Sequence, residues 1–134
     1  MEELELLDFG NIRKFSLDGF TTIAKVCKVY DGDTITTIFK YKGEYNKWSI
    51  RIYGIDTPEI RTSNVEEKAA GIAARDFLQD RILNKIVRLE CKEFDKYGRL
   101  LANVFFEDQN ISETMIEQNM AKPYFGGKKE IFAS

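Results

Sequence analysis

Two short turns of this chain present carboxylates beside strand-like segments. Asp31-Gly32-Asp33-Thr34 joins two segments rich in β-branched residues, and Asp56-Thr57-Pro58-Glu59 follows a segment in which apolar and polar residues alternate. Thr57 precedes a proline, which favours extended backbone, and Pro58 has no amide hydrogen for a strand ladder. The strand must therefore end near this point, so the two carboxylates of the second turn, Asp56 and Glu59, lie at the end of the strand.

Carboxylates brought together from two turns suit a hard cation. Asp33 and Asp56 would form an oxygen site for Ca²⁺ or Mg²⁺ if a backbone carbonyl and waters completed the ligand set. Aspartates beside glycine or before Thr-Pro also stabilise turns through local hydrogen bonds. The spacing alone leaves both the metal site and simple turn chemistry open.

Two arginines lie at strand ends, where a guanidinium group can bind a phosphate with two parallel hydrogen bonds. Arg51 belongs to the alternating segment and Arg99 follows the turn Asp95-Lys96-Tyr97-Gly98. Converging arginines would form an anion site, to which Lys96 and Tyr97 add a cation and a phenol. The alternative is that these side chains are simply exposed to solvent, as most arginines are.

Aromatic residues near the end of the chain offer a further binding surface. Tyr124 and Phe125 could stack against a nucleic-acid base, or they could pack against the core. The chain has no histidine, which excludes imidazole catalysis and zinc sites of the Cys/His type. Acid–base chemistry must therefore come from carboxylates, lysines or tyrosines.

Composition places the chain among ordinary globular proteins. Its 134 residues are 43% hydrophobic and 31% charged, which predicts one folded domain. The net charge of −2 means that any phosphate binding must depend on cations placed locally in a site. Cys27 and Cys91 each lie in a strand-like segment, so we expect free thiols rather than a disulfide.

The chain divides into three parts. Residues 1–19 form an N-terminal extension of which Phe9, Phe15 and Leu17 could pack on the domain, residues 20–125 form the domain, and residues 126–134 form a tail. The acidic start lacks the basic region of a signal peptide, and no apolar run approaches the roughly 20 residues that span a bilayer. We therefore expect an intracellular protein without a membrane partner.

Periodicity predicts five short strands and two helices. The strands are expected at 20–30, 34–39, 45–55, 86–94 and 100–106, with a hairpin turn at 41–44. Ser63-Asn64-Val65-Glu66 has the form of a capping box and should begin a helix that ends near Leu83. Its expected apolar face contains Val65, Ala69, Ile72, Ala73 and Phe77 and could extend to residues 80–82, and Gly71 indicates a close contact.

These elements predict a mainly β fold with helices. A second, short helix is expected at 112–118. Five short strands with a helix between the third and fourth, and a short C-terminal helix, are typical of the OB fold, a five-stranded β-barrel.

The three motifs together resemble the signature of the staphylococcal nuclease family. Asp31-Gly32-Asp33-Thr34, Arg51 five residues before Asp56-Thr57-Pro58-Glu59, and Asp95-Lys96-Tyr97-Gly98-Arg99 match in order and identity. The resemblance extends over about residues 21–124. It implies an OB barrel and a Ca²⁺-dependent phosphodiesterase that hydrolyses DNA and RNA, single-stranded or from frayed duplex, and leaves 3′-phosphate ends.

The resemblance also implies a role for each residue that matches a family motif. Asp33 and Asp56 would be carboxylate ligands of Ca²⁺ and Thr57 would contribute its backbone carbonyl. Glu59 matches the proposed general base, and Arg51 and Arg99 match the phosphate-binding arginines. Lys96 and Tyr97 match residues that contact the terminal phosphate of the nucleotide, and Tyr124 is carried over to the nucleotide-binding position that follows.

The segment around Tyr124 departs from the family pattern. The family has a pair of tyrosines that flank the base, whereas this chain reads Ala121-Lys122-Pro123-Tyr124-Phe125-Gly126. Two alternatives to a nuclease stay open at this point. One is an OB-fold module that binds nucleic acid without catalysis, and the other is a structural or partner-docking domain.

Overall fold

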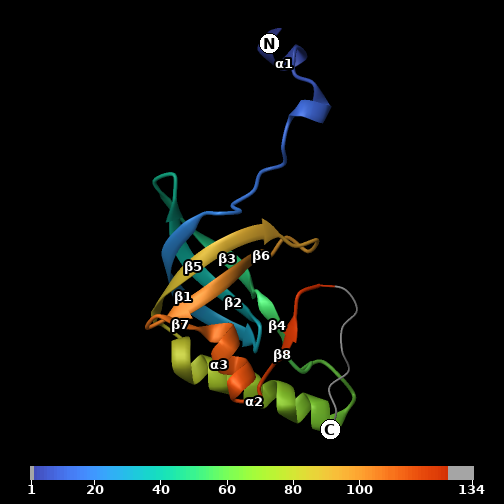
Figure 1. Ribbon diagram of the computed structural model, residues 1–134, viewed down its shortest axis with the longest axis vertical. Coiled ribbons are helices and arrows are strands. Elements are labelled where there is room, and N and C mark those ends of the chain that lie inside the picture. Colours follow the sequence, from blue (N-terminus) through green and yellow to red (C-terminus); the bar gives the residue numbers. More distant parts are fainter. Residues whose placement is uncertain (1, 127–134) are drawn as a thin grey trace.

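The computed structural model describes residues 2–126 and shows a β-barrel with its two longer helices at one end (Figure 1). Antiparallel pairing joins five strands in the order β3, β2, β1, β5 and β6. Their bounds are β1 Thr21–Asp31, β2 Thr34–Tyr41, β3 Glu44–Ile52, β5 Ile86–Phe94 and β6 Leu100–Phe106. A parallel pairing of β3 with β6 closes the sheet, so the predicted OB-type barrel is confirmed.

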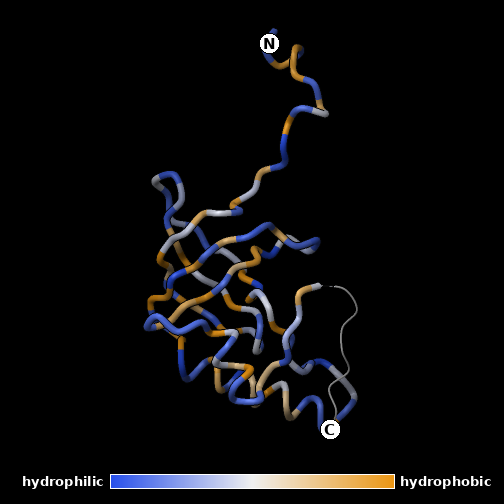
Figure 2. The backbone as a smooth tube through the Cα atoms, viewed as in Figure 1, coloured by the Kyte–Doolittle hydropathy of each residue, from blue (hydrophilic) through white to orange (hydrophobic). Residues whose placement is uncertain are grey.

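Alternation of side chains along the strands builds the core. Inward positions are apolar and fully buried because successive side chains of a strand point to opposite faces. Examples from four strands are Val26, Ile35, Ile50 and Leu89, each 0% exposed. The tube coloured by hydropathy shows hydrophobic and hydrophilic positions interspersed along the barrel strands (Figure 2).

The alternating segment that was predicted as one strand from 45 to 55 is interrupted. β3 ends at Ile52, and β4 (Gly54–Asp56) is a separate strand that pairs with β8 (Lys122–Tyr124). The change of direction occurs at Gly54, whose φ of 88° suits glycine. This break explains why Ile55 is buried, although strict alternation along one strand would place it on the face opposite Ile50 and Ile52.

The long helix α2 (Val65–Ile82) lies across one end of the barrel (Figure 1). Its N-cap is Asn64, whose side chain accepts a hydrogen bond from the amide of Glu67, so the predicted cap at Ser63 is wrong. The predicted apolar face is wrong at Val65, Ala69 and Ala73, which are exposed, whereas Phe77 packs against the core. Val65 is 80% exposed, and the buried face consists of Gly71, Ala74, Leu78 and Ile82.

A second helical unit follows the barrel strands. The two-residue strand β7 (Gln109–Asn110) pairs with β6 and leads into α3 (Ile111–Glu117). Asn110 caps α3 by accepting from the amide of Glu113, and Met115 is fully buried. This helix agrees with the prediction to within one residue at each end, and β8 was not predicted.

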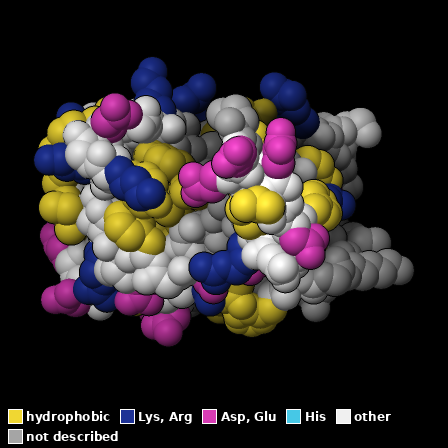
Figure 3. Space-filling model, turned by 90° about the horizontal axis from the view of Figure 1, so that it is seen from above, with side chains coloured by type: hydrophobic (Ala, Val, Ile, Leu, Met, Phe, Trp, Pro, Cys, Tyr) yellow, Lys and Arg dark blue, Asp and Glu magenta, His cyan; other side chains and the backbone are white. Residues whose placement is uncertain are grey.

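The N-terminal segment projects away from the barrel and contains a short helix, α1 (Glu2–Glu5), and a 3-10 turn, η1 (Phe9–Asn11) (Figure 1). Viewed from that end, acidic and hydrophobic side chains lie side by side (Figure 3). Of the residues expected to pack on the domain, Leu17 is buried and the ring of Phe15 lies against Tyr41 and Phe94. Phe9 is 96% exposed and does not pack.

Both cysteines are free, as predicted. No helix within residues 2–126 is long and apolar enough to cross a membrane. The predicted tail begins at Gly126, and its residues 127–134 lie outside the described part of the chain.

Candidate functional site

One cavity of about 540 Å³ brings the sequence-predicted site residues together. It opens where β3, β4, β8 and the turn between β5 and β6 meet, so its walls come from segments far apart in the chain. Every residue that the sequence analysis assigned to the site lines this cavity: Asp33, Arg51, Asp56, Thr57, Glu59, Lys96, Tyr97, Arg99 and Tyr124.

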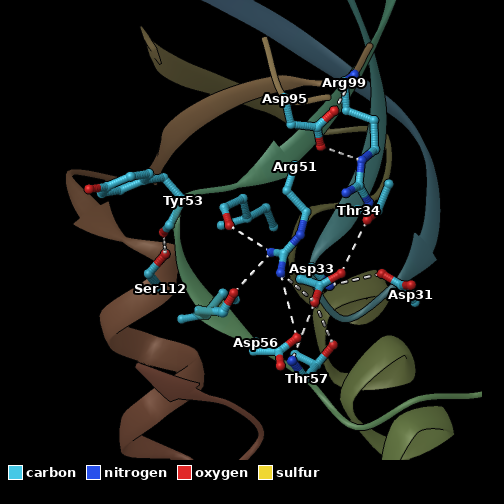
Figure 4. A network of polar contacts seen from close by, with 12 residues as sticks. Asp31, Asp33, Thr34, Arg51, Tyr53, Asp56, Thr57, Asp95, Arg99 and Ser112 are labelled. Carbon is cyan, nitrogen blue, oxygen red and sulfur yellow. Dashed lines mark hydrogen bonds and ion pairs between the residues drawn. The ribbon is translucent and has the colours of Figure 1, made fainter. Parts of the chain in front are cut away.

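Arg51 lies at the centre of the polar network (Figure 4). Its Nη2 atom is 3.3 Å from Oδ2 of Asp33 and 3.5 Å from Oδ1 of Asp56. Its Nη1 atom donates to the backbone carbonyls of Ile52, at 3.0 Å, and Ile55, at 2.9 Å. These carbonyls flank the break between β3 and β4, so the backbone turn that separates the strands also fixes the guanidinium.

The turn between β1 and β2 is bound to the turn after β4. Oδ2 of Asp33 accepts hydrogen bonds from the backbone amide of Thr57, at 3.3 Å, and from its hydroxyl, at 3.1 Å. Oδ1 of Asp33 accepts from the hydroxyl of Thr34. Because Asp33, Asp56 and Thr57 are all buried, this contact fixes the two acidic turns relative to each other.

A third carboxylate, Asp31, also lines the cavity. Burial, reinforced by the neighbouring Asp33, raises the pKa of Asp31 to about 7 from its usual value of 3.8. Hydrogen bonding from the amide of Asp33 to Oδ1 of Asp31 partly offsets that rise. Sequence analysis quoted this residue within its motif but gave it no role, although its position at the end of β1 marks it as part of the same turn.

The donor set fits a hard cation of the Ca²⁺ type. Asp33 and Asp56 approach the same nitrogen of Arg51, which shows that their oxygens converge on a common point. Within residues 2–126 no group of three or more acidic, cysteine or histidine side chains is close enough to enclose a metal. Two carboxylates leave ligand positions of a Ca²⁺ ion for a backbone carbonyl, waters and a substrate oxygen.

Arg99 is held at the opposite wall of the cavity by Asp95. Nε of Arg99 donates to Oδ2 of Asp95 at 2.7 Å (Figure 4). Oδ1 of Asp95 accepts from the backbone amides of Tyr97 and Arg99, each at 2.9 Å. Sequence analysis missed this role of Asp95, although an aspartate that opens a turn ending in glycine was the available signal.

Glu59 lies at the rim, where the chain passes the start of α2. Its side chain is exposed, and its backbone amide donates to Oε2 of Glu67 at 3.3 Å. The backbone of Pro58 and Glu59 packs directly on Gly71, where a Cβ atom would lie 2.7 Å from the Pro58 carbonyl oxygen and 2.9 Å from that of Glu59. The predicted close contact at Gly71 is therefore confirmed, and it positions Glu59.

Aromatic residues line the remaining wall. Tyr97 is 73% exposed and lies beneath the cations of Lys96 and Arg99. Phe125 is exposed and its ring centroid lies 5.6 Å from that of Tyr53. Tyr53 received no role in the sequence analysis because it was treated as part of a continuous strand.

Comparisons with known proteins agree with this geometry. Residues 49–132 match the family model described as staphylococcal nuclease homologue. The chain is 36% identical over 103 residues to a thermonuclease of Staphylococcus hyicus, which covers 75% of this chain and 59% of that protein. It is 36% identical over 100 residues to an endonuclease of Haemophilus influenzae, with 75% and 51% covered. A thermonuclease of Staphylococcus intermedius is 34% identical over 118 residues, with 87% and 68% covered.

The chain thus spans between half and about two thirds of the length of these relatives. The family match covers more than half of the chain and includes the turns that carry Glu59 and Arg99. The closed barrel and the shared cavity are independent of that match and agree with it. This chain therefore belongs to the staphylococcal nuclease family.

Proposed function

We propose that this chain is a Ca²⁺-dependent phosphodiesterase that hydrolyses DNA and RNA and leaves 3′-phosphate ends. The observation that carries the proposal is the convergence of Asp33, Arg51, Asp56, Glu59 and Arg99 on one cavity. An open groove with exposed aromatic rings suits unstacked bases. This supports single strands or frayed duplex as substrates.

Hydrolysis of a phosphodiester builds negative charge on the nonbridging oxygens of phosphorus as water attacks. Arg99 reaches the cavity from one wall and Arg51 from another, so the substrate phosphate would lie between two guanidinium groups. Donors placed where charge develops bind the transition state more tightly than the ground state, and each is worth about 3 kcal/mol.

Arg51 has a second function in this arrangement. Both of its terminal nitrogens already contact carboxylates or carbonyls, so it holds the two acidic turns together besides adding positive charge. Within residues 2–126 the guanidinium of Arg99 has one carboxylate partner, Asp95, and it also lies over the ring of Tyr97. Arg99 is therefore the residue that we expect to move most readily onto the phosphate.

Asp33 and Asp56 would hold the Ca²⁺ ion with the backbone carbonyl of Thr57. The bound ion would supply Lewis-acid polarisation of a phosphate oxygen. Glu59, at the rim and open to solvent, would accept the proton of the attacking water. Lys96, Tyr97 and Tyr124 would contact the nucleotide on either side of the scissile phosphate.

The first test separates a nuclease from a module that only binds. Labelled single-stranded DNA and RNA are incubated with the protein in Ca²⁺ and then in a chelator, and the product ends are identified by mass. We expect cleavage in Ca²⁺ only, with 3′-phosphate ends. Binding that persists without cleavage in Ca²⁺ would reject the enzyme and support the binding module.

The second test separates the roles of the carboxylates. Asp33→Asn and Asp56→Asn should raise the Ca²⁺ concentration needed for half-maximal cleavage, because each removes a ligand charge. Glu59→Gln should lower turnover steeply with a smaller shift in that midpoint, because it removes a proton acceptor. If Glu59→Gln shifts the midpoint as far as Asp33→Asn and keeps near-normal turnover, Glu59 is a ligand.

A further inference from the structure

The outward face of β1, β2 and β3 carries four exposed lysines, Lys25, Lys28, Lys40 and Lys47, which we call the lysine face. The strand register places Lys25 beside Ile38 and Ile38 beside Lys47, so two lysines share one row across three strands. Lys28 lies beside Thr36 in the next row, and Lys40 lies opposite Tyr45. No acidic side chain occupies an outward position of the three strands between residues 21 and 30, 34 and 40, or 45 and 51.

A β-bulge contributes to this arrangement. The register between β1 and β2 shifts between Val26 and Lys28, so the strand gains one residue there. Lys28 instead of Cys27 therefore stands opposite Thr36. Bulges re-aim side chains in this way, and this one adds a cation to the outward face.

The lysine face is continuous with the cavity. Tyr45, Lys47, Ser49 and Arg51 occupy alternate positions of β3, and such positions share one face of a strand. Arg51 stands opposite Thr34 at the cavity end. Arg51 lies six positions after Tyr45 in β3, which corresponds to a distance of about 20 Å. The rows between them offer the hydroxyls of Thr36 and Ser49 and the lysine side chains.

We propose that the lysine face binds the phosphodiester backbone of a nucleic-acid strand that continues out of the cavity, with Tyr45 as a stacking surface for a base. The proposal rests on the proposed function in one respect, because it assumes that the scissile phosphate of the same nucleic-acid strand lies in the cavity. Tyr45 is 71% exposed, and Nζ of Lys40 lies 5.8 Å from the centre of its ring. Aromatic rings beside cations are the elements with which single strands are bound without sequence preference.

The local positive charge of the lysine face is what would attract a nucleic-acid strand. The chain as a whole has a net charge of −2, so its overall field does not attract a polyanion. Charges further apart than the Debye length of about 8–10 Å are screened. A nucleic-acid strand would therefore be attracted mainly by the lysines that lie within about one Debye length of its phosphates. The lysine face leads along the β-strands into the cavity. A flexible nucleic-acid strand can follow this path, whereas a flat bilayer surface cannot.

The test compares two triple variants with the same change in net charge. The face variant combines Lys25→Gln, Lys28→Gln and Lys47→Gln and removes three of the four lysines of the lysine face. The control variant combines Lys14→Gln, Lys68→Gln and Arg81→Gln and removes three exposed cations elsewhere. Affinity is measured in a chelator, so that no cleavage occurs, over a series of salt concentrations. The probes are fluorescent oligothymidylates of about three and about 20 nucleotides, the second longer than the usual OB-fold sites.

We expect the face variant to bind the long probe at least about tenfold more weakly at low salt. The slope of log affinity against log salt should fall by about 2, because each lost phosphate contact on a single strand contributes about 0.7. Binding of the short probe and cleavage of a short substrate in Ca²⁺ should not change. The control variant should retain the wild-type slope with both probes.

Three results would overturn the proposal. One is an unchanged slope for the face variant, another is an equal loss in the control variant, and the third is an equal loss with the short probe. Binding to phosphatidylserine vesicles that depends on the face lysines, with long-probe binding unaffected, would also overturn it in favour of a membrane surface. If the wild type cleaves nothing yet binds the long probe through these lysines, the nuclease fails and the binding face stands.

Discussion

Asp95 binds the side chain and the backbone of Arg99 at once. Its Oδ2 accepts from Nε of Arg99 at 2.7 Å, and its Oδ1 accepts from the backbone amide of the same residue at 2.9 Å. One carboxylate therefore sets both the turn and the direction of the guanidinium. Among the described residues, the carboxylate of Asp95 contacts only Nε of this guanidinium, so Nη1 and Nη2 could turn toward a phosphate.

Removing the charge of Asp95 should lower turnover while the turn persists. In Asp95→Asn the amide oxygen can still accept the backbone hydrogen bonds, but the ion pair with Arg99 is lost. We expect kcat to fall about three- to tenfold, equivalent to about 1 kcal/mol. Steady-state cleavage of a labelled strand measures this effect. Asp108→Asn, which removes the exposed partner of Arg88, should leave kcat unchanged, and an equal loss there would contradict the assignment.

The fork geometry of Arg99 should matter beyond its charge. Arg99→Lys keeps the positive charge but cannot form two parallel hydrogen bonds. We expect turnover to fall at least about tenfold, or about 1.4 kcal/mol, with an unchanged free energy of unfolding. Arg88→Lys, at an exposed pair on the outer surface, is the matched control. Wild-type turnover in Arg99→Lys would show that bidentate geometry is not used.

Arg51 should stabilise the metal-free protein. Arg51→Met would leave Asp33 and Asp56, both buried, without the cation between them. Removing one partner of a buried ion pair costs about 3–5 kcal/mol, so the free energy of unfolding in a chelator should fall by that order. Added Ca²⁺ should restore part of the loss, because it replaces the missing positive charge.

Denaturant unfolding with and without Ca²⁺ measures the effect at Arg51. Arg75→Met, which removes an exposed pair with Asp76, should cost less than about 1 kcal/mol and should not respond to Ca²⁺. If Ca²⁺ stabilises Arg51→Met no more than it stabilises the wild type, the two carboxylates do not share a cation with the arginine.

Gly71 links helix packing to the position of Glu59. A Cβ atom in Gly71→Ala would meet the carbonyl oxygens of Pro58 and Glu59 at 2.7 and 2.9 Å, so the backbone that carries Glu59 must move. We expect a loss of about 1–3 kcal/mol in stability together with reduced turnover. Ala73→Gly, at an exposed position of α2, should cost about 1 kcal/mol with normal turnover. Normal turnover in Gly71→Ala would show that Glu59 tolerates displacement.

Cys91 should make stability depend on pH in the alkaline range. Burial raises the pKa of its thiol to about 11 from 9.0. Between these values the unfolded chain loses a proton that the folded chain keeps, so stability is fully present below pH 9 and declines as pH rises toward 11. The full loss is on the order of 2–3 kcal/mol.

The measurement at Cys91 uses a Cys27→Ala background, so that one thiol remains. The difference in unfolding free energy between this protein and its Cys91→Ala derivative should shrink as pH is raised through that range. A difference that stays constant with pH would show that the Cys91 thiol ionises equally in both states.

The local features of this protein follow from its sequence. Alternation of Ile50, Arg51 and Ile52 specifies a strand with one buried face, because side chains of a strand alternate strictly. The two acidic turns also follow from local sequence, since Asp31 accepts from the backbone amide of Asp33 and Pro58 cannot extend a strand ladder. The three motifs, matched in order, were enough to predict the barrel and a set of residues that all line one cavity.

Tertiary structure decided how those parts meet. The break at Gly54 depends on pairing with β8, a contact with residues about 70 positions away in the chain that no local pattern encodes. The predicted apolar face of α2 was incomplete for a similar reason. Ala74 and Leu78 are buried against the barrel end, and the pattern of hydrophobic residues alone did not identify them. The position of Arg51 between two carboxylates likewise required the closed barrel, since sequence specifies which side chains a turn carries but only packing between distant segments brings their charges within a few ångströms.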